Sequence, residues 1–191
     1  MNKLNLGCGL FKKEGYVNVD FEDRVNPDIV LDLNNLEGYK RFEDEEFDEI
    51  NMSHVLEHLN NPFDIMKELH RILKPNGLLI IEVPHFSRGF SHSQHARGFD
   101  VTFPYYYDHR FSGGYYGINF DLVDMRLSWM TQFELKRQVV SNPIIFYVSK
   151  FINKLITFLA NLSPYLCSRI WCFWVGGFEE IKFVFSKPAD S

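Results

Sequence analysis

The sequence predicts an α/β protein with a mostly parallel sheet. Five short apolar runs with polar ends fill its first half, and one strongly amphipathic helix separates the last two of them. The runs are Leu4–Leu6, Tyr16–Val19, Ile29–Leu31, Phe47–Met52 and Leu78–Val83. Strands joined by crossovers form parallel, right-handed units, so ligands are expected at the carboxyl ends of the strands.

A glycine-rich turn follows the first run directly. In Leu-Asn-Leu-Gly-Cys-Gly, residues 4–9, two glycines flank one small residue, and Asp20 ends the next run. Glycine lets bare backbone approach a ligand, and a carboxylate after the neighbouring strand can accept hydrogen bonds from both ribose hydroxyls. This order predicts a nucleoside cofactor site. A dinucleotide is disfavoured, because Lys12 stands at the third glycine position and Asp20 follows Gly9 by only 11 residues.

The amphipathic helix begins at Asn60 or Asn61, either of which can cap it, with Pro62 in its first turn. Apolar residues then recur at helical spacing from Phe63 to Leu73, and 74–77, Lys-Pro-Asn-Gly, end the helix. The first two crossovers are shorter than a parallel connection normally needs. We expect a single helical turn within 7–15 and no full helix within 22–28.

The second half has a different character. Residues 86–116 are rich in His, Tyr, Phe and Gly without a clean period, which is typical of a functional loop. We expect strands over 120–127, 133–140 and 178–185, and helices over 144–160 and 164–174. The whole chain, 1–191, is predicted to be one domain, with its cofactor-binding half at 1–84 and a substrate-side cover at 85–116 and 141–177.

Composition excludes several classes of protein. A net charge of −5 argues against a nonspecific grip on nucleic acid, and 46% hydrophobic residues predict a packed globular core. Three cysteines, Cys8, Cys167 and Cys172, do not make a disulfide framework. The first strand leaves no room for a signal peptide before it. Both features predict a cytoplasmic protein.

The chain resembles the class I S-adenosylmethionine-dependent methyltransferases, in the compact branch related to the type 11 group. Besides the glycine turn, the resemblance rests on Val-Asn-Val-Asp at 17–20, Leu-Asp-Leu at 31–33, Phe-Asp-Glu-Ile at 47–50, Ser-His-Val-Leu-Glu-His-Leu at 53–59 and the segment 68–81. It implies a Rossmann-like sheet of seven strands, mostly parallel, with the last strand antiparallel. It also implies S-adenosylmethionine as the cofactor.

The resemblance assigns cofactor-binding roles along these motifs. The glycine turn, with Asn5, Gly7, Cys8 and Gly9, would pass under the methionine part, and Ser53 and His54 would line the methionine end. Asp20, followed by Phe21, would hold the ribose, and Asp32 with Leu33 would meet the adenine. Asn5 stands where the family usually has an acid.

A base helps methyl transfer if the acceptor is a hydroxyl, and a neutral imidazole suits that role. His85, which directly follows the fifth strand, and His109 are the candidate catalytic residues. A small molecule or a glycan is the expected acceptor. No metal site is predicted. The pair His54 and His58 has no obvious further ligand nearby, and the set His92, His95 and His109 lacks a recognised metal-binding spacing.

The apolar stretch 144–175 has three interpretations: a lid over the sheet, a face that pairs two copies in a homodimer, or an interfacial membrane helix. A protein that binds S-adenosylmethionine without turnover, or a membrane-associated scaffold, is the alternative to an enzyme.

Overall fold

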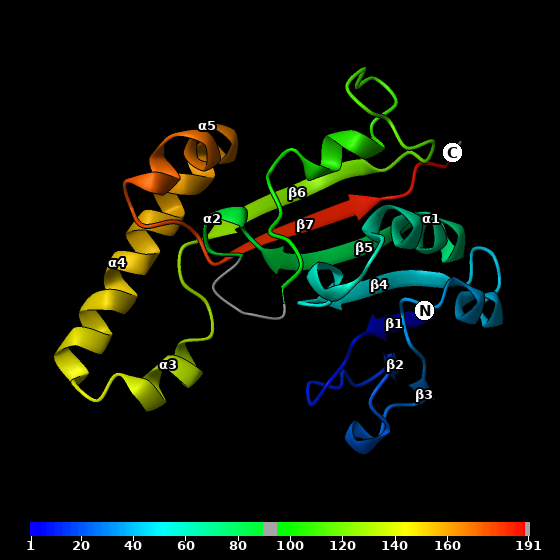
Figure 1. Cartoon of the computed structure of the whole chain (residues 1–191), viewed down its shortest axis with the longest axis horizontal. Helices are drawn as coiled ribbons and strands as arrows, with labels where there is room; N and C mark the ends of the chain where they lie inside the picture. The colour runs from blue at the N-terminus through cyan, green and yellow to red at the C-terminus, as the bar shows by residue number, and fades with distance from the viewer. Residues whose placement is uncertain (90–94, 190–191) are drawn as a thin grey trace.

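The computed structural model describes residues 1–89 and 95–189, which form a seven-stranded sheet flanked by helices (Figure 1). The strand order is β3-β2-β1-β4-β5-β7-β6. The strands are β1 (Lys3–Leu6), β2 (Val17–Asp20), β3 (Ile29–Val30), β4 (Phe47–Ser53), β5 (Leu73–Pro84), β6 (Asp121–Ser128) and β7 (Glu180–Ser186).

The strand directions confirm the predicted mostly parallel sheet with an antiparallel last strand. From β3 to β5 each neighbouring pair is parallel, whereas β7 lies between β5 and β6 and pairs antiparallel with both. The register places Leu4 opposite Ile50 and Leu79 opposite Phe185. All four of these side chains are fully buried and lie in one row on the same face of the sheet, so this face carries the core, whereas Ile80 and Val184 on the other face are only half-buried.

The first two crossovers contain very little helix, and the first contains less than the sequence predicts. The helical turn expected within 7–15 is wrong, because this segment forms only turns. Between β2 and β3 there is a single 3₁₀ turn, η1 (Asp23–Val25). In Figure 1 the blue strands β1 to β3 accordingly lie at an edge of the molecule with no long helix over them. Backbone at the ends of β1 and β2 therefore stays accessible.

The predicted central helix is α1 (Pro62–Ile72). The side chain of Asn61 accepts a hydrogen bond from the backbone N–H of Asp64, and Pro62 occupies the first turn. One face buries Ile65, Met66 and Leu69 against the sheet. Two 3₁₀ segments precede it, η2 (Leu36–Arg41) and η3 (Leu56–His58), and η3 follows β4 at the ligand-binding edge.

The strand predicted over 133–140 is wrong: this segment is the helix α3 (Phe133–Val139). Its interior, Glu-Leu-Lys-Arg-Gln, consists of strong helix formers. Glu134 lies in the first turn, and Lys136 and Arg137 lie in the last, where both signs of charge complement the helix dipole. Local helix propensity therefore decides the structure of this segment.

The remaining helices belong to the C-terminal half. They are α2 (Phe86–Gly89), the 3₁₀ segment η4 (Phe103–Tyr107), α4 (Pro143–Leu162), α5 (Pro164–Arg169) and η5 (Trp171–Phe173). The helix predicted over 164–174 is thus divided at Ile170, and Gly176 and Gly177, both with positive φ, turn the chain back into the sheet. Figure 1 shows α4, in yellow, lying beyond the end of the sheet rather than on its face.

Candidate active site

A pocket of about 590 Å³ opens at the carboxyl ends of β1, β2 and β4. This is the edge where parallel sheets bind ligands, and the volume suits a small-molecule cofactor. Six of the predicted cofactor residues line it. They are Gly7, Asp20, Phe21, Asp32, Leu33 and His54.

Gly7 sits at the floor of the pocket in a conformation that other residues rarely adopt. Its φ is +66°, and a Cβ added there would lie 2.1 Å from Cγ2 of Val55. Val55 follows β4 and lines the same pocket. The chain therefore brings bare backbone to the pocket wall where any side chain would collide.

Asp20 ends β2 and organises the turn opposite it. Its Oδ2 accepts a hydrogen bond from the backbone N–H of Gly9 at 2.8 Å, and its Oδ1 accepts one from Glu22 N–H at 2.9 Å. Each carboxylate oxygen has a second lone pair, so the group can still accept two hydroxyls from the pocket side. The side chain is almost fully buried, which keeps it in one orientation.

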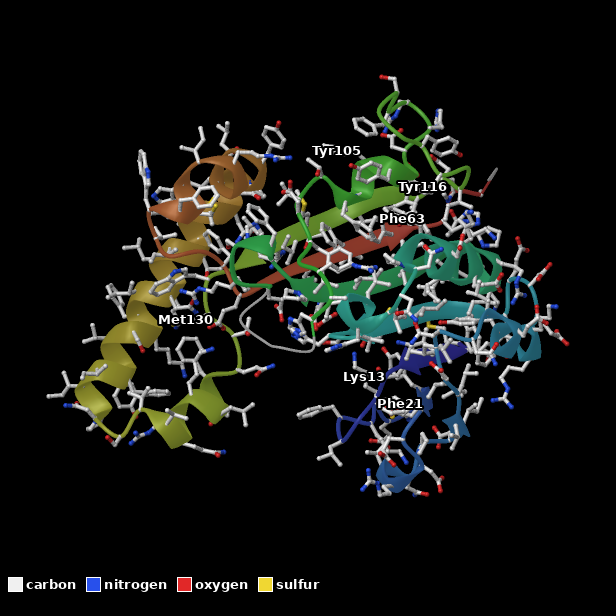
Figure 2. All side chains as sticks on the ribbon, viewed as in Figure 1. Lys13, Phe21, Phe63, Tyr105, Tyr116 and Met130 are labelled. Atoms are coloured by element: carbon white, nitrogen blue, oxygen red, sulfur yellow. The ribbon has the colours of Figure 1, made fainter. Side chains whose placement is uncertain are left out.

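The adenine end of the pocket is more open. Asp32 is exposed, and its Oδ1 accepts from the backbone N–H of Asn34 at 2.9 Å. Phe21 is 72% exposed although it lines the pocket, and Figure 2 shows it beside β2, next to the glycine loop. An aromatic ring left in water at a pocket wall offers a stacking surface for a planar base.

Four predicted cofactor residues do not line the pocket. The amide of Asn5 donates to Asn18 Oδ1 at 2.9 Å and so ties β1 to β2. Cys8 is buried, and the backbone of Gly9 is bound to Asp20. Ser53 donates to Glu82 Oε2 at 2.8 Å. These residues shape the turn and the strand ends around the pocket.

Comparison with known proteins assigns this arrangement to a family. Residues 16–81, from just before β2 to within β5, match the family described as methyltransferase domain. These residues carry a methyltransferase domain. None of the curated proteins matches it at the level of sequence.

Solved structures of methyltransferases share the fold over nearly the whole chain. An S-adenosylmethionine-dependent methyltransferase from Archaeoglobus fulgidus is 19% identical, with a TM-score of 0.60, over 97% of this chain and 86% of its own. A putative sarcosine dimethylglycine methyltransferase from Galdieria sulphuraria is 13% identical, with a TM-score of 0.57, over 98% and 78%. Phosphoethanolamine N-methyltransferase 2 from Haemonchus contortus is 17% identical, with a TM-score of 0.53, over 98% and 49%.

The residues of this methyltransferase fit the cofactor. Backbone without a side chain at Gly7, a ribose acid at Asp20 and an exposed ring at Phe21 provide for a methionine chain, a sugar and a base in that order along one pocket.

His54 stands at the methionine end in a strained backbone conformation. Its φ is +54°, and its ring lies between two carboxylates, with Nε2 at 3.0 Å from Glu180 Oε2 and Nδ1 at 3.5 Å from Glu57 Oε1. Hydrogen bonding to Glu180, together with the negative charge of Glu57 beside the ring, raises the pKa of His54 to about 10. A cationic His54 donates from Nε2 to Glu180 and faces the Glu57 carboxylate with Nδ1, so it holds this wall of the pocket in place and is not a proton acceptor.

Four lining residues were missed by the sequence prediction: Asn34, Val55, His58 and Leu59. Three of them belong to Ser-His-Val-Leu-Glu-His-Leu, of which only the first two residues were assigned to the cofactor. A signal was present, because a motif that turns from strand into helix at the carboxyl edge exposes several residues to a ligand.

The two candidate bases lie elsewhere. His85 is fully buried and lines no part of the cofactor pocket. Ser168 Oγ donates to Asp100 Oδ1 at 3.0 Å, so it accepts from His85 Nε2 at 2.9 Å, while His85 Nδ1 accepts from the backbone N–H of Ser87 at 3.2 Å. This geometry favours a structural role. His109 bonds Asn119 on an exposed loop, also outside the pocket lining.

The burial of His85 predicts a pH dependence of stability. Desolvation lowers its pKa to about 4, with Asp100 opposing the shift, while the unfolded value is near 6.5. Between pH 6.5 and pH 4 this histidine is protonated in the unfolded chain but neutral in the folded chain. The free energy of unfolding therefore falls as the pH falls through this range. The contribution of His85 to the free energy of unfolding should be about 2 kcal/mol smaller at pH 5 than at pH 7.5.

Urea unfolding of the native protein and of His85→Asn at both pH values measures that contribution. The pKa of half-buried His70 shifts in the same direction and that of His54 in the opposite one, so only the difference between the two proteins isolates His85. A difference that stays constant between pH 7.5 and pH 5 would contradict the prediction.

Proposed function

We propose that this methyltransferase methylates a hydroxyl group of a polar small molecule or of a sugar. The observation that carries the proposal is a second pocket, of about 610 Å³, whose lining begins at Asn60 and Asn61. These residues directly follow Leu59, the last residue that lines the cofactor pocket. A molecule in the second pocket would therefore lie beside the first pocket.

The second pocket combines aromatic rings with polar groups. Phe63 and Tyr106 supply rings, while Arg97, Asp100 and Arg169 supply charges. Arg169 pairs with Asp100 at 2.7 Å, and Arg97 Nη2 donates to the backbone carbonyl of Asn60 at 3.1 Å. Rings that cover the apolar face of a sugar and charged groups that bond its hydroxyls are the pattern expected of a carbohydrate-like ligand.

Methyl transfer depends mainly on the alignment of the acceptor atom with the methyl group. Bound S-adenosylmethionine supplies a methyl group already activated on a positively charged sulfur. Asp20 fixes the ribose, Gly7 lets the methionine part approach the backbone, and His54 holds the wall at the methionine end. Side chains of the second pocket then have to place the acceptor oxygen in line with the methyl group, which converts a two-body encounter into a positioned reaction.

Calorimetric titration with S-adenosylmethionine and with S-adenosylhomocysteine tests the cofactor half of this proposal. A panel of sugars, nucleotide sugars and small polyols, assayed for release of S-adenosylhomocysteine, tests the acceptor half. For an acceptor that turns over, Arg97→Ala should raise KM about tenfold and leave the affinity for the cofactor unchanged. Turnover with amine acceptors alone would overturn the hydroxyl assignment.

A second candidate function, contact with a membrane, rests on the orientation of α4. Its polar side chains face the protein: Asn161 bonds the backbone of Leu127 through both its amide atoms, and Asn153 Oδ1 accepts from Met130 N–H at 2.9 Å. Apart from buried Phe146 and Ala160, its apolar side chains face outward, and only 11% of its apolar 18-residue stretch is buried. By length and composition α4 could also span a membrane.

The outward apolar residues follow one another at helical spacing. We call them the apolar face of α4, and all are at least half exposed: Ile144, Val148, Phe151, Leu155, Phe158 and Leu162. Soluble monomers rarely leave such a continuous patch in water. We propose that this face lies on lipid, with exposed Lys154 at its flank to meet anionic headgroups.

Flotation with liposomes that contain anionic lipid tests this surface. The double variant Phe151→Ser/Phe158→Ser should reduce the bound fraction at least about fivefold, since each ring loses its share of buried apolar area. Val123→Ser, which removes an exposed apolar side chain from β6, is the matched control and should bind like the native protein. If the native protein does not float and light scattering shows a dimer that the double variant abolishes, the face instead binds a second copy of the chain.

A cytoplasmic location belongs to the same proposal. Cys8, Cys167 and Cys172 are all free and buried, which a reducing compartment permits.

A further inference from the structure

A buried carboxylate without a hydrogen bond lies just behind the cofactor pocket. Glu57, in η3, is fully buried, and within the described residues neither of its oxygens has a hydrogen-bond partner. The nearest nitrogens are Nδ1 of His54 at 3.5 Å and Nε2 of His95 at 3.9 Å, both beyond good hydrogen-bond distance. Charged groups are buried in this way where they are paired closely or coordinate a metal.

Two imidazoles stand beside this carboxylate. The rings of His58 and His95 meet at 4.9 Å between centroids, at an angle of 73°. One ligand atom from each of Glu57, His58 and His95 lies within 4.8 Å of the others. A backbone hydrogen bond from Ala96 N–H to the Glu57 carbonyl, at 3.2 Å, fixes the His95 segment to η3. We propose that Glu57, His58 and His95 bind one divalent transition-metal ion.

The ligand set and its surroundings suit such an ion. Two neutral imidazoles and one carboxylate are the donors preferred by zinc, manganese, iron and cobalt, and three protein ligands leave coordination positions open. Bonds of about 2.1 Å in a tetrahedral site place ligand atoms roughly 3.4 Å apart, so the three groups need to close in by about an ångström. His58 is exposed and His95 is half-buried, and both side chains can make that movement by rotation.

The location gives the ion a role in the proposed function. His58 both belongs to the cluster and lines the cofactor pocket, so an open coordination position lies next to the methionine end. An acceptor hydroxyl bound there would be oriented and made more acidic. In the transfer, the acceptor oxygen bonds the methyl carbon as the carbon–sulfur bond breaks, the bonding pair remains on sulfur, and the hydroxyl proton passes to water. This role rests on the proposed function, whereas metal binding does not.

Metal binding can be measured directly on the full chain after treatment with a chelator. Calorimetric titration with Zn²⁺ and with Mn²⁺, and optical titration with Co²⁺, should give one site per chain. The Co²⁺ complex should absorb in the visible range, as nitrogen and oxygen ligation with low coordination number requires. No saturable site for any of the three ions at millimolar concentration would overturn the proposal.

Variants identify the ligands. Glu57→Gln, His58→Ala and His95→Ala should each lower the affinity for Zn²⁺ at least about tenfold. His109→Ala, which removes a loop histidine outside the cluster, is the control and should titrate like the native protein. If the buried Glu57→Gln variant does not fold, the two histidine variants decide the matter, because both lie nearer the surface. Equal affinity in the native protein and in both histidine variants would overturn the assignment.

The same proteins separate this inference from the proposed function. S-adenosylmethionine is titrated in the presence of a chelator, and Zn²⁺ in the absence of cofactor. Cofactor binding and turnover without a metal site, or turnover that a chelator leaves unchanged, would overturn the metal inference alone. A metal site in a chain that binds no cofactor would support the metal inference and contradict the proposed function.

Discussion

Replacing Asp20 with alanine is expected to lower the affinity for S-adenosylmethionine at least about a hundredfold. The carboxylate would hold two ribose hydroxyls, and hydrogen bonds to a charged group contribute about 1.5–3 kcal/mol each. The same substitution also releases the backbone N–H groups of Gly9 and Glu22, so the glycine turn loses the group that anchors it across the pocket. Calorimetric titration of both proteins measures the change.

Two further variants separate the parts of that effect. Asp20→Asn keeps one oxygen for the Gly9 N–H and removes the charge, so its loss of affinity should be intermediate. Asp23→Ala removes an exposed acid three residues away, outside the pocket lining, and should bind like the native protein. Binding by Asp20→Ala within threefold of the native affinity, with the thermal unfolding midpoint preserved, would show that this acid does not hold the ribose.

The part of the site that lies close together in sequence could be predicted from the sequence. Gly7, Asp20 and Asp32 each follow a short strand, and parallel strands bring their carboxyl ends to one edge. The same regularity made the sheet predictable. What these positions need is only strand order and direction, and both follow from the crossover pattern.

Features that depend on contacts between distant segments could not be predicted. His85 directly follows a strand, as a base at the ligand edge would, yet Ser168, 83 residues later in the chain, packs over it and takes its Nε2. Glu57 and His58 meet His95 only because the segment after β5 folds back onto η3. Neither contact can be predicted from the spacing of these residues in the sequence.

The C-terminal half shows a different limit. The segment 133–140 was predicted to be a strand, but it finds no partner in the sheet, and its helix-forming interior makes it the helix α3. For α4 the helix was predictable from composition, and its orientation was not. The side chains of Asn153, Thr157 and Asn161 accept hydrogen bonds from backbone N–H groups at the end of β6 and just after it, and so the polar side of α4 turns inward.

Replacing Gly7 with alanine is expected to destabilise the fold and to close the methionine end of the pocket. Two costs add at this position. An alanine at a φ of +66° costs about 1–2 kcal/mol of backbone strain. Its Cβ would also lie 2.1 Å from Cγ2 of Val55, and this overpacking costs about 1–3 kcal/mol more. The free energy of unfolding in urea should therefore fall by about 2–5 kcal/mol, and cofactor affinity should fall with it.

Two variants divide the cost into its causes. Gly15→Ala has a similar φ of +77° and open space within 4 Å, so it should show the backbone cost alone. The double variant Gly7→Ala/Val55→Ala removes the methyl groups that collide, and its loss relative to Val55→Ala should shrink towards that of Gly15→Ala. If Gly7→Ala lowers the free energy of unfolding no more than Gly15→Ala does, the Val55 side chain moves aside without strain. The glycine is then required by the ligand that approaches the backbone, and the loss of cofactor affinity alone would measure that requirement.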